Sequence, residues 1–220
     1  MIKAVIFDFN GTLYDDSAIH ITIWKELYKD ITKGRGEPDD FINRIIGTQN
    51  SYIVREIYKD INQEISDEDV ERISKDKERR YREYSVEHNL CHLIKGAEEV
   101  MDYIKERYPM NLSTNSIDEN VDFFFKEFKI GRWFERNKIT NDNGILKTKS
   151  EMYKKAAENI GVDLKDCLIF EDSAHGIKEA YEAGCRNIIL IDPKQRKISY
   201  PGVIQTVKDY TEVKLNIFDC

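Results

Sequence analysis

The sequence predicts a doubly wound α/β fold, in which a parallel sheet carries helices on both faces and the chain is interrupted by an all-helical insertion. Short apolar runs at residues 4–7, 167–170 and 187–191 alternate with longer stretches of helical periodicity, which is the pattern of βαβ units. Between the first run and the rest, residues 15–89 carry helical patterns alone. The length of 220 residues suits one large domain or a core with a smaller inserted domain.

The first strand is expected at residues 3–7, and the inserted helices follow it. Their apolar periodicity begins after Asp16, with Trp24 and Leu27 on one face, and continues at residues 38–46, 51–61 and 66–88. We therefore assign residues 15–89 to a helical cap and residues 1–14 and 90–220 to the α/β core. Within the last cap helix, residues 71–82 mix both charge signs, which is typical of a solvated helix face.

The second half of the core alternates helices and strands. Helices are expected at residues 97–108, 118–128, 149–160 and 174–183, and strands at residues 110–113, 167–170 and 187–191. Gly161 and Gly184 follow the last two helices, where glycine commonly ends a helix. No strand is predicted after residue 191.

Composition excludes several classes of protein. The net charge of −7 argues against a general nucleic-acid binder, and no apolar stretch approaches the roughly 18 residues needed to cross a bilayer. The first residues lack the pattern of a signal peptide, and the four cysteines are too widely spaced for a zinc site or a disulfide framework. We therefore expect a cytoplasmic protein without nucleic-acid or membrane partners. We also expect a monomer, as is common for small enzymes, and no exposed apolar stripe contradicts this.

Reactive side chains follow the predicted strands or lie close to them. These are Asp8 and Asn10, Thr114 and Asn115, Lys147, and Glu171 and Asp172. Ligands bind beyond the carboxyl ends of the strands in an open parallel sheet. A carboxylate there can attack phosphorus, hydroxyl and amide groups can bind phosphoryl oxygens, a lysine can neutralise charge, and two further carboxylates can hold Mg²⁺.

The segments DFNGT, LSTNS, Lys147 and IFEDS occur in the order of the four motifs of the haloacid dehalogenase superfamily, and the sequence resembles that family over nearly its whole length. The helical insertion after the first motif resembles the branch that contains β-phosphoglucomutase and many small-molecule phosphatases. The resemblance implies a Rossmann-like core, a Mg²⁺ cofactor and a small phosphorylated metabolite as substrate.

The resemblance also implies roles for individual residues. Asp8 would be the nucleophile and a metal ligand, and Asn10 would offer its backbone carbonyl to the metal. Thr114 and Asn115 would bind phosphate, Lys147 would hold it, and Glu171 and Asp172 would complete the metal shell. In the cap, His20 and the loop of Gly47, Thr48 and Gln49 would contact the substrate.

Asn10 departs from the family pattern, because phosphatases and mutases of this branch carry an aspartate there as general acid and base. Such assistance is worth roughly 10²–10⁴ in rate, and an amide cannot supply it. Lys147-Thr148 also replaces a Lys-Pro pair, and Lys95-Gly96 replaces a Pro-Gly pair, without changing a reacting group.

Several interpretations of Asn10 remain open. On the first interpretation, the protein is a Mg²⁺-dependent phosphatase that forms an aspartyl phosphate on Asp8. It tolerates the loss of the acid because the leaving group of its substrate is good, or because another group such as His20 supplies the proton. Alternatively, it is a weakly active or inactive protein that binds a phosphorylated ligand. A sugar-phosphate mutase is a further alternative, and the asparagine could also have been introduced artificially to trap a complex.

Overall fold

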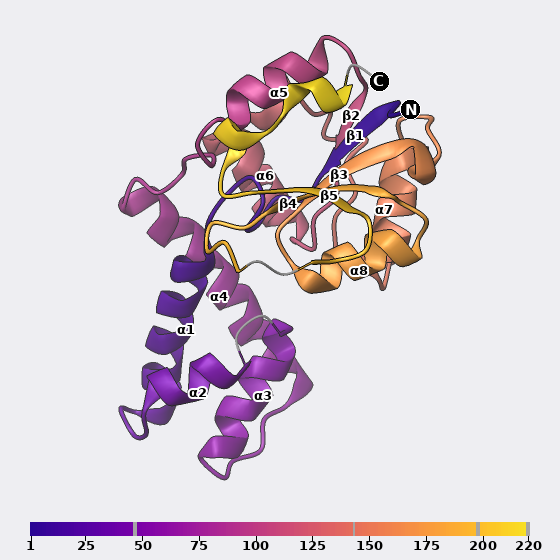
Figure 1. Ribbon diagram of the computed structural model, residues 1–220. Helices are drawn as coiled ribbons and strands as arrows, with labels where there is room; N and C mark the ends of the chain where they lie inside the picture. The colour runs from indigo at the N-terminus through magenta and orange to yellow at the C-terminus, as the bar shows by residue number, and fades with distance from the viewer. Residues whose placement is uncertain (46–47, 143, 197–198, 219–220) are drawn as a thin grey trace. The chain divides into compact units, whose positions relative to one another are not determined.

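The computed structural model describes residues 1–45, 48–142, 144–196 and 199–218 (Figure 1). The chain divides into two compact units. One unit comprises Met1–Asp15 and Cys91–Cys220, and the other comprises Asp16–Leu90. Each division falls one residue after the boundary expected from the sequence.

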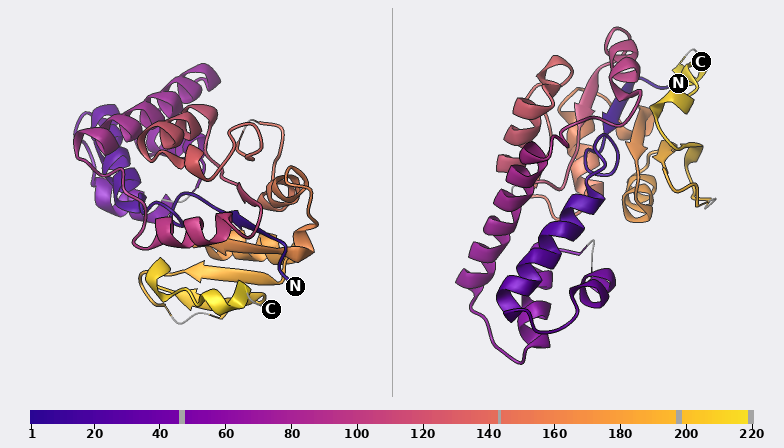
Figure 2. Two further views of the ribbon diagram at one scale, coloured as in Figure 1. Left: turned by 90° about the horizontal axis from the view of Figure 1, so that it is seen from above. Right: turned by 90° about the vertical axis from the view of Figure 1, so that its left-hand side faces the viewer.

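The first unit is built around a parallel five-stranded sheet in the order β2-β1-β3-β4-β5, which confirms the predicted α/β class (Figures 1 and 2). The strands are β1 (Ala4–Phe7), β2 (Met110–Leu112), β3 (Cys167–Glu171), β4 (Asn187–Ile191) and β5 (Val203–Val207). Phe7 pairs with Leu112 on one side and with Phe170 on the other, so these strands end at the same level. The sequence did not predict β5.

Helices cover both faces of this sheet. They are α5 (Ala97–Lys105), α6 (Asp118–Glu127), α7 (Lys149–Glu158) and α8 (Ala174–Glu182), with the short 3₁₀ turns η1 (Ile130–Arg132), η2 (Leu164–Asp166), η3 (Tyr210–Glu212) and η4 (Leu215–Phe218). Side chains of α7 and α8 pack with Ile6 and Ile169 on one face. On the other face, Phe7 stacks on Phe170, and Phe170 stacks on Tyr210.

Within the described residues of the second unit, all regular secondary structure is helical. It consists of α1 (Ser17–Thr32), α2 (Pro38–Ile45), α3 (Asn50–Asp60) and α4 (Asp67–Glu87) (Figure 1). Buried apolar residues of α1, α3 and α4, among them Trp24, Ile53 and Ile73, form its core. The expectation that residues 71–82 form a solvated face is wrong at Lys77 and Glu78, which are 2% and 8% exposed because α4 packs against α1 and α3.

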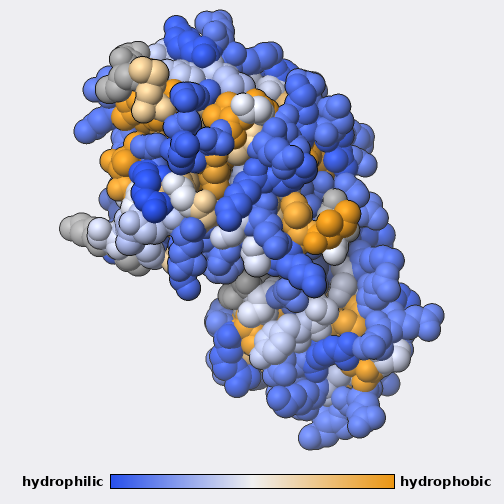
Figure 3. Space-filling view, turned by 90° about the vertical axis from the view of Figure 1, so that its right-hand side faces the viewer, coloured by the Kyte–Doolittle hydropathy of each residue, from blue (hydrophilic) through white to orange (hydrophobic). Residues whose placement is uncertain are grey.

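The surface is dominated by polar and charged groups. On the face in Figure 3, hydrophilic residues cover most of the area and hydrophobic residues appear in small groups. Across the residues that the structure describes, no helix combines the length and the apolar character that a membrane span requires. Cys91, Cys167 and Cys185 are free thiols.

Candidate active site

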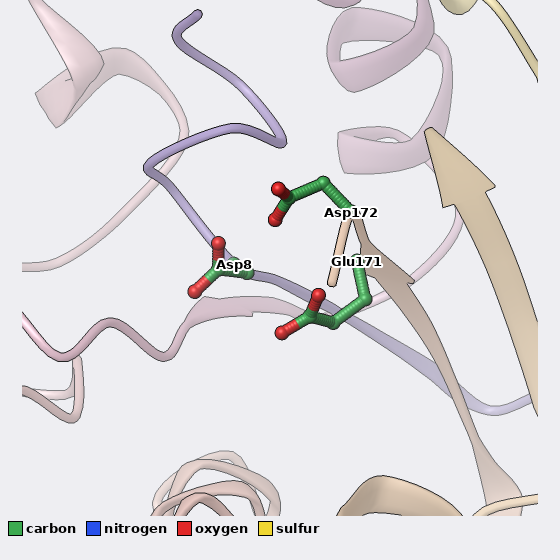
Figure 4. Close-up of side chains that lie close together, drawn as sticks. All are labelled: Asp8, Glu171 and Asp172. Atoms are coloured by element: carbon green, nitrogen blue, oxygen red, sulfur yellow. The ribbon is translucent and has the colours of Figure 1, made fainter. Parts of the chain in front are cut away.

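Three carboxylates gather where β1 and β3 end. One oxygen each of Asp8, Glu171 and Asp172 lies within 4.8 Å of the others, and the side chains of Glu171 and Asp172 extend toward Asp8 (Figure 4). Asp8 is 4% exposed and Glu171 is fully buried. Since Phe7 and Phe170 are paired, the acids that follow them leave neighbouring strands at the same level. The parallel register therefore explains how residues far apart in the sequence form one cluster.

Lys149 is the cation of this cluster. Its Nζ lies 2.5 Å from Asp8 Oδ1 and 2.8 Å from Glu171 Oε1. The hydroxyl of Tyr153, one turn further along α7, donates to the same Glu171 oxygen at 3.0 Å. Residues in the first two turns of α7 thus hold the carboxylates of Asp8 and Glu171 in place.

Lys147, the lysine predicted from the sequence, does not join the cluster. α7 begins one residue after Thr148. The Thr148 hydroxyl accepts a hydrogen bond from the backbone N–H of Glu151. In return, the Glu151 carboxylate accepts hydrogen bonds from the backbone N–H groups of Lys147 and Thr148. This capping box leaves Lys147 exposed before the helix and makes Lys149 the first helical residue, turned toward the sheet. The lysine beside Asp8 is therefore Lys149, and not Lys147 as the sequence predicted.

Burial and mutual repulsion set the ionisation of the carboxylates. Burial raises the pKa of Asp8 to about 6, with Lys149 opposing and Glu171 adding to the shift. Burial and the charges of Glu171 and Asp8 raise the pKa of Asp172 to about 8. Burial also opposes ionisation of Glu171, but contact with Lys149 outweighs it and lowers the pKa. Glu171 is therefore the most acidic member.

The donor set fits a divalent cation. Lys149 contacts Asp8 and Glu171, but burial, together with repulsion between the carboxylates, still raises the pKa values of Asp8 and Asp172. Carboxylate oxygens are the ligands that Mg²⁺ prefers. Two glycines allow this crowding, because a Cβ at Gly11 would collide with the Asp172 carboxylate and a Cβ at Gly176 with that of Glu171.

Hydroxyl groups surround Asp8 and Asn10. The Thr12 hydroxyl lies 3.2 Å from Asp8 Oδ2 and 3.2 Å from Asp172 Oδ1. The hydroxyls of Ser116 and Thr114 donate to Asn10 Oδ1 at 2.8 and 3.3 Å. The amide oxygen of Asn10 is therefore turned toward the segment that follows β2, and Asn10 is connected to the predicted phosphate-binding residue Thr114.

Other predicted site residues lie elsewhere. Asn115, which was expected to bind phosphate, is exposed beside Thr114, and the next residue, Ser116, donates to Asn10. Gly47 lies outside the described residues. Thr48 and Gln49 are exposed at the start of α3, where the Thr48 hydroxyl donates to the Ile45 carbonyl at 2.7 Å.

His20 belongs to a hydrogen-bonded cluster within the helical unit. Its Nε2 lies 3.1 Å from Asp16 Oδ2, and its Nδ1 lies 2.7 Å from Nζ of Lys77. The ring stacks on Tyr81, whose hydroxyl donates to Asp16. Since an ammonium group only donates, Nδ1 accepts and Nε2–H donates to Asp16 when Lys77 is charged.

Sequence reasoning missed Lys149, Thr12, Ser116 and Tyr153 as members of the cluster. A signal for Lys149 was present, because the helix expected at residues 149–160 already has Lys149 as its first residue, and the capping box Thr148-x-x-Glu151 supports that start. The positions of Ser116 and Tyr153 depend on tertiary packing and have no comparable local signature.

Comparisons with known proteins agree with this architecture. The model of the haloacid dehalogenase-like hydrolase family matches residues 5–190. YhcW of Bacillus subtilis is 26% identical over 98% of this chain and 95% of that protein, and the phosphorylated carbohydrates phosphatase of Thermotoga maritima is 23% identical over 85% of this chain and 84% of its own length.

Solved structures extend the similarity to three dimensions. A family IA, variant 3 hydrolase of the same family from Entamoeba histolytica superposes with a TM-score of 0.87 at 30% identity, covering 98% of this chain and 96% of that one. β-Phosphoglucomutase from Clostridium difficile superposes with a TM-score of 0.77 at 21% identity, covering 100% and 96% of the two chains. The chain therefore belongs to the haloacid dehalogenase-like hydrolase family.

Proposed function

We propose that this protein is a Mg²⁺-dependent phosphatase of a small phosphorylated metabolite, with Asp8 as the nucleophile. The observation that carries the proposal is the position of Asp8, a buried carboxylate at the end of β1 in contact with Lys149 and beside Glu171 and Asp172. Two of the relatives above support the substrate class, because one is named as a phosphatase of phosphorylated carbohydrates and the other as β-phosphoglucomutase.

Asp8 would attack the phosphorus atom through a carboxylate oxygen, and the bond to the leaving oxygen would break. Its pKa of about 6 leaves it ionised at neutral pH, as a nucleophile requires. Lys149 neutralises charge on Asp8 and is close enough to neutralise charge on a phosphoryl group bound there. Water would then release phosphate from the aspartyl phosphate and restore Asp8.

Mg²⁺ would be held by the carboxylates of Asp8, Glu171 and Asp172 and by the backbone carbonyl of Asn10. When bound, the ion would offset negative charge on the phosphoryl oxygens. The hydroxyls of Thr114 and Ser116 donate to Asn10 Oδ1 and would turn to donate to phosphoryl oxygens when a phosphorylated ligand binds.

Asn10 favours a second candidate, a protein that binds a phosphorylated ligand and turns it over slowly or not at all. Its amide carries no proton that it can give to a leaving oxygen, and its Oδ1 is engaged by Ser116 and Thr114. A substrate whose leaving group needs no proton would react fastest, and an alkyl phosphate would react slowest.

Hydrolysis of p-nitrophenyl phosphate with Mg²⁺ distinguishes the candidates, because p-nitrophenolate leaves without protonation. The unsubstituted protein, Asn10→Asp and Asp8→Asn should be compared, with and without EDTA. Turnover in the parent that disappears in Asp8→Asn and in EDTA supports a phosphatase. If the unsubstituted protein binds phosphate without turnover and only Asn10→Asp hydrolyses the ester, the binding protein is supported. Turnover that does not require a metal contradicts the proposal.

A further inference from the structure

Arg196 lies in the turn that follows β4, at the end of the sheet where the carboxylates gather. Glu171, the last residue of β3, pairs with Leu190 of β4, so these two strands end at the same level. The chain then turns, and the backbone N–H of Gln195 donates to the carbonyl of Asp192 at 2.9 Å. Arg196 comes directly after this turn and is therefore placed beside the residues that leave β3.

The buried carboxylate of Asp192 fixes Arg196. Asp192 is 1% exposed, and its backbone N–H donates to the Val207 carbonyl of β5 at 2.7 Å. Its Oδ1 accepts from Nε of Arg196 at 3.0 Å, and its Oδ2 accepts from the Arg196 backbone N–H at 2.8 Å. Gln195, between them in the sequence, has a φ of 47°, in the left-handed region that residues other than glycine seldom adopt. Both oxygens of one buried acid thus hold the backbone and the half-exposed side chain of Arg196.

From this anchored position the guanidinium group reaches the main chain of Asp172. Nη2 of Arg196 donates to the carbonyl oxygen of Asp172 at 3.3 Å. Because β3 ends at Glu171, this carbonyl lies beyond the paired residues of the strand. A guanidinium group presents its donors in a rigid planar fork, so one arginine bridges Asp192 and Asp172 in a fixed geometry. The bridge therefore fixes the peptide group next to the Cα atom from which the Asp172 side chain leaves.

We propose that Arg196 is a positioning residue for Asp172 in the metal site. By holding the carbonyl of Asp172 against the fixed carboxylate of Asp192, it sets the direction in which the Asp172 side chain extends toward Asp8 (Figure 4). Outer partners of metal ligands act in this way, by orienting a ligand that they do not replace. The inference rests on the metal site of the proposed function and adds Arg196 and Asp192 to it.

The test is the Mg²⁺ affinity of the whole chain, measured by calorimetry below the unfolding temperature. Arg196→Met removes the donors and keeps much of the aliphatic side chain. Partners of metal ligands typically change metal affinity by roughly 10–100-fold, and we expect about tenfold weaker binding, because the contact is to the main chain of the ligand. The sign separates positioning from charge, since loss of a positive charge beside a cation site would by itself strengthen Mg²⁺ binding.

Arg186→Met is the matched control. Arg186 is exposed and directly precedes β4, so it lies at the opposite end of the sheet from Arg196. It also donates to main-chain carbonyls, because its Nη1 lies 2.6 Å from the oxygen of Tyr181 and 3.0 Å from that of Cys185. This variant loses the same charge and the same kind of contact, and it should bind Mg²⁺ as the parent does.

Weaker binding in Arg196→Met, with parental affinity in Arg186→Met, supports the inference. Affinity within twofold of the parent overturns it, as does tighter binding or an equal loss in Arg186→Met. If Arg196→Met does not fold, Arg196→Lys takes its place under the same criteria, because lysine keeps the charge beside Asp192 but has no planar fork to reach Asp172 as well. Absence of Mg²⁺ binding in the parent overturns the metal site itself, and this failure is recognised from the parent alone.

Discussion

The exchange of Lys149 for methionine provides the sharpest test of the site, because Lys147 is a matched control two residues away. The Lys149 side chain is 8% exposed and contacts Asp8 and Glu171, which are 5% and 0% exposed, so solvent screens these pairs little. Removing one partner of a buried ion pair costs about 3–5 kcal/mol. For a protein of this size that corresponds to a fall of about 6–20 °C in unfolding temperature.

The same substitution should lower turnover of p-nitrophenyl phosphate by about 10²-fold or more, as expected for loss of a group that stabilises charge in the reaction. Lys147→Met removes the same charge from an exposed side chain and should change stability by no more than about 0.5 kcal/mol. Differential scanning fluorimetry and initial rates, measured on both variants in EDTA and in Mg²⁺, are sufficient. A larger effect of Lys147→Met than of Lys149→Met on either quantity would refute the assignment.

Three further predictions concern the same cluster. Asn10→Asp should raise the rate on alkyl phosphates by roughly 10²–10⁴ and on p-nitrophenyl phosphate much less, and equal gains on both would contradict loss of an acid. Because Asp8 and Asp172 have raised pKa values of about 6 and 8, the metal-free protein holds extra protons relative to the unfolded chain and should lose stability as pH rises from 4 to 8. Mg²⁺ competes with those protons, so its stabilising effect should be larger at pH 8.5 than at pH 6; equal shifts in unfolding temperature would exclude this competition. Gly176→Ala should lower the unfolding temperature and weaken Mg²⁺ binding, because the added Cβ would displace the Glu171 carboxylate. This should outweigh the helix propensity of alanine, which exceeds that of glycine by about 1 kcal/mol. A higher unfolding temperature would show that the site can adapt.

The sheet could be predicted where strands are continuous apolar runs. The expected strands at residues 3–7 and 167–170 correspond to β1 and β3, because strands buried on both faces read as unbroken apolar sequence. β5, with the sequence VIQTV, lies at the sheet edge and has exposed side chains such as Ile204, so its pattern was too weak to predict.

The gathering of Asp8, Glu171 and Asp172 could be predicted because these acids stand at or directly after the ends of β1 and β3. The lysine could not be chosen by its distance along the chain, since Lys147 and Lys149 are both close to the required position. The start of the helix at residue 149 was predicted correctly; what decides the choice is that this first helical residue meets Asp8 and Glu171, a contact made only in the folded chain. The burial of Lys77 likewise depends on the packing of α4 against other helices, which charge patterning along one helix does not reveal.

Charge also gives a reason why asparagine at position 10 is compatible with an intact site. Lys149 contacts the carboxylates of Asp8 and Glu171, yet burial and mutual repulsion still raise the pKa values of Asp8 and Asp172. A fourth carboxylate at position 10 would add repulsion toward both the cluster and a bound phosphate, whereas the amide keeps the hydrogen bonds from Ser116 and Thr114 without that charge. Asn10→Asp should therefore weaken binding of inorganic phosphate while it accelerates turnover. Isothermal titration with phosphate in Mg²⁺ measures the first effect, and tighter phosphate binding by the aspartate variant would show that charge balance is not what the asparagine provides.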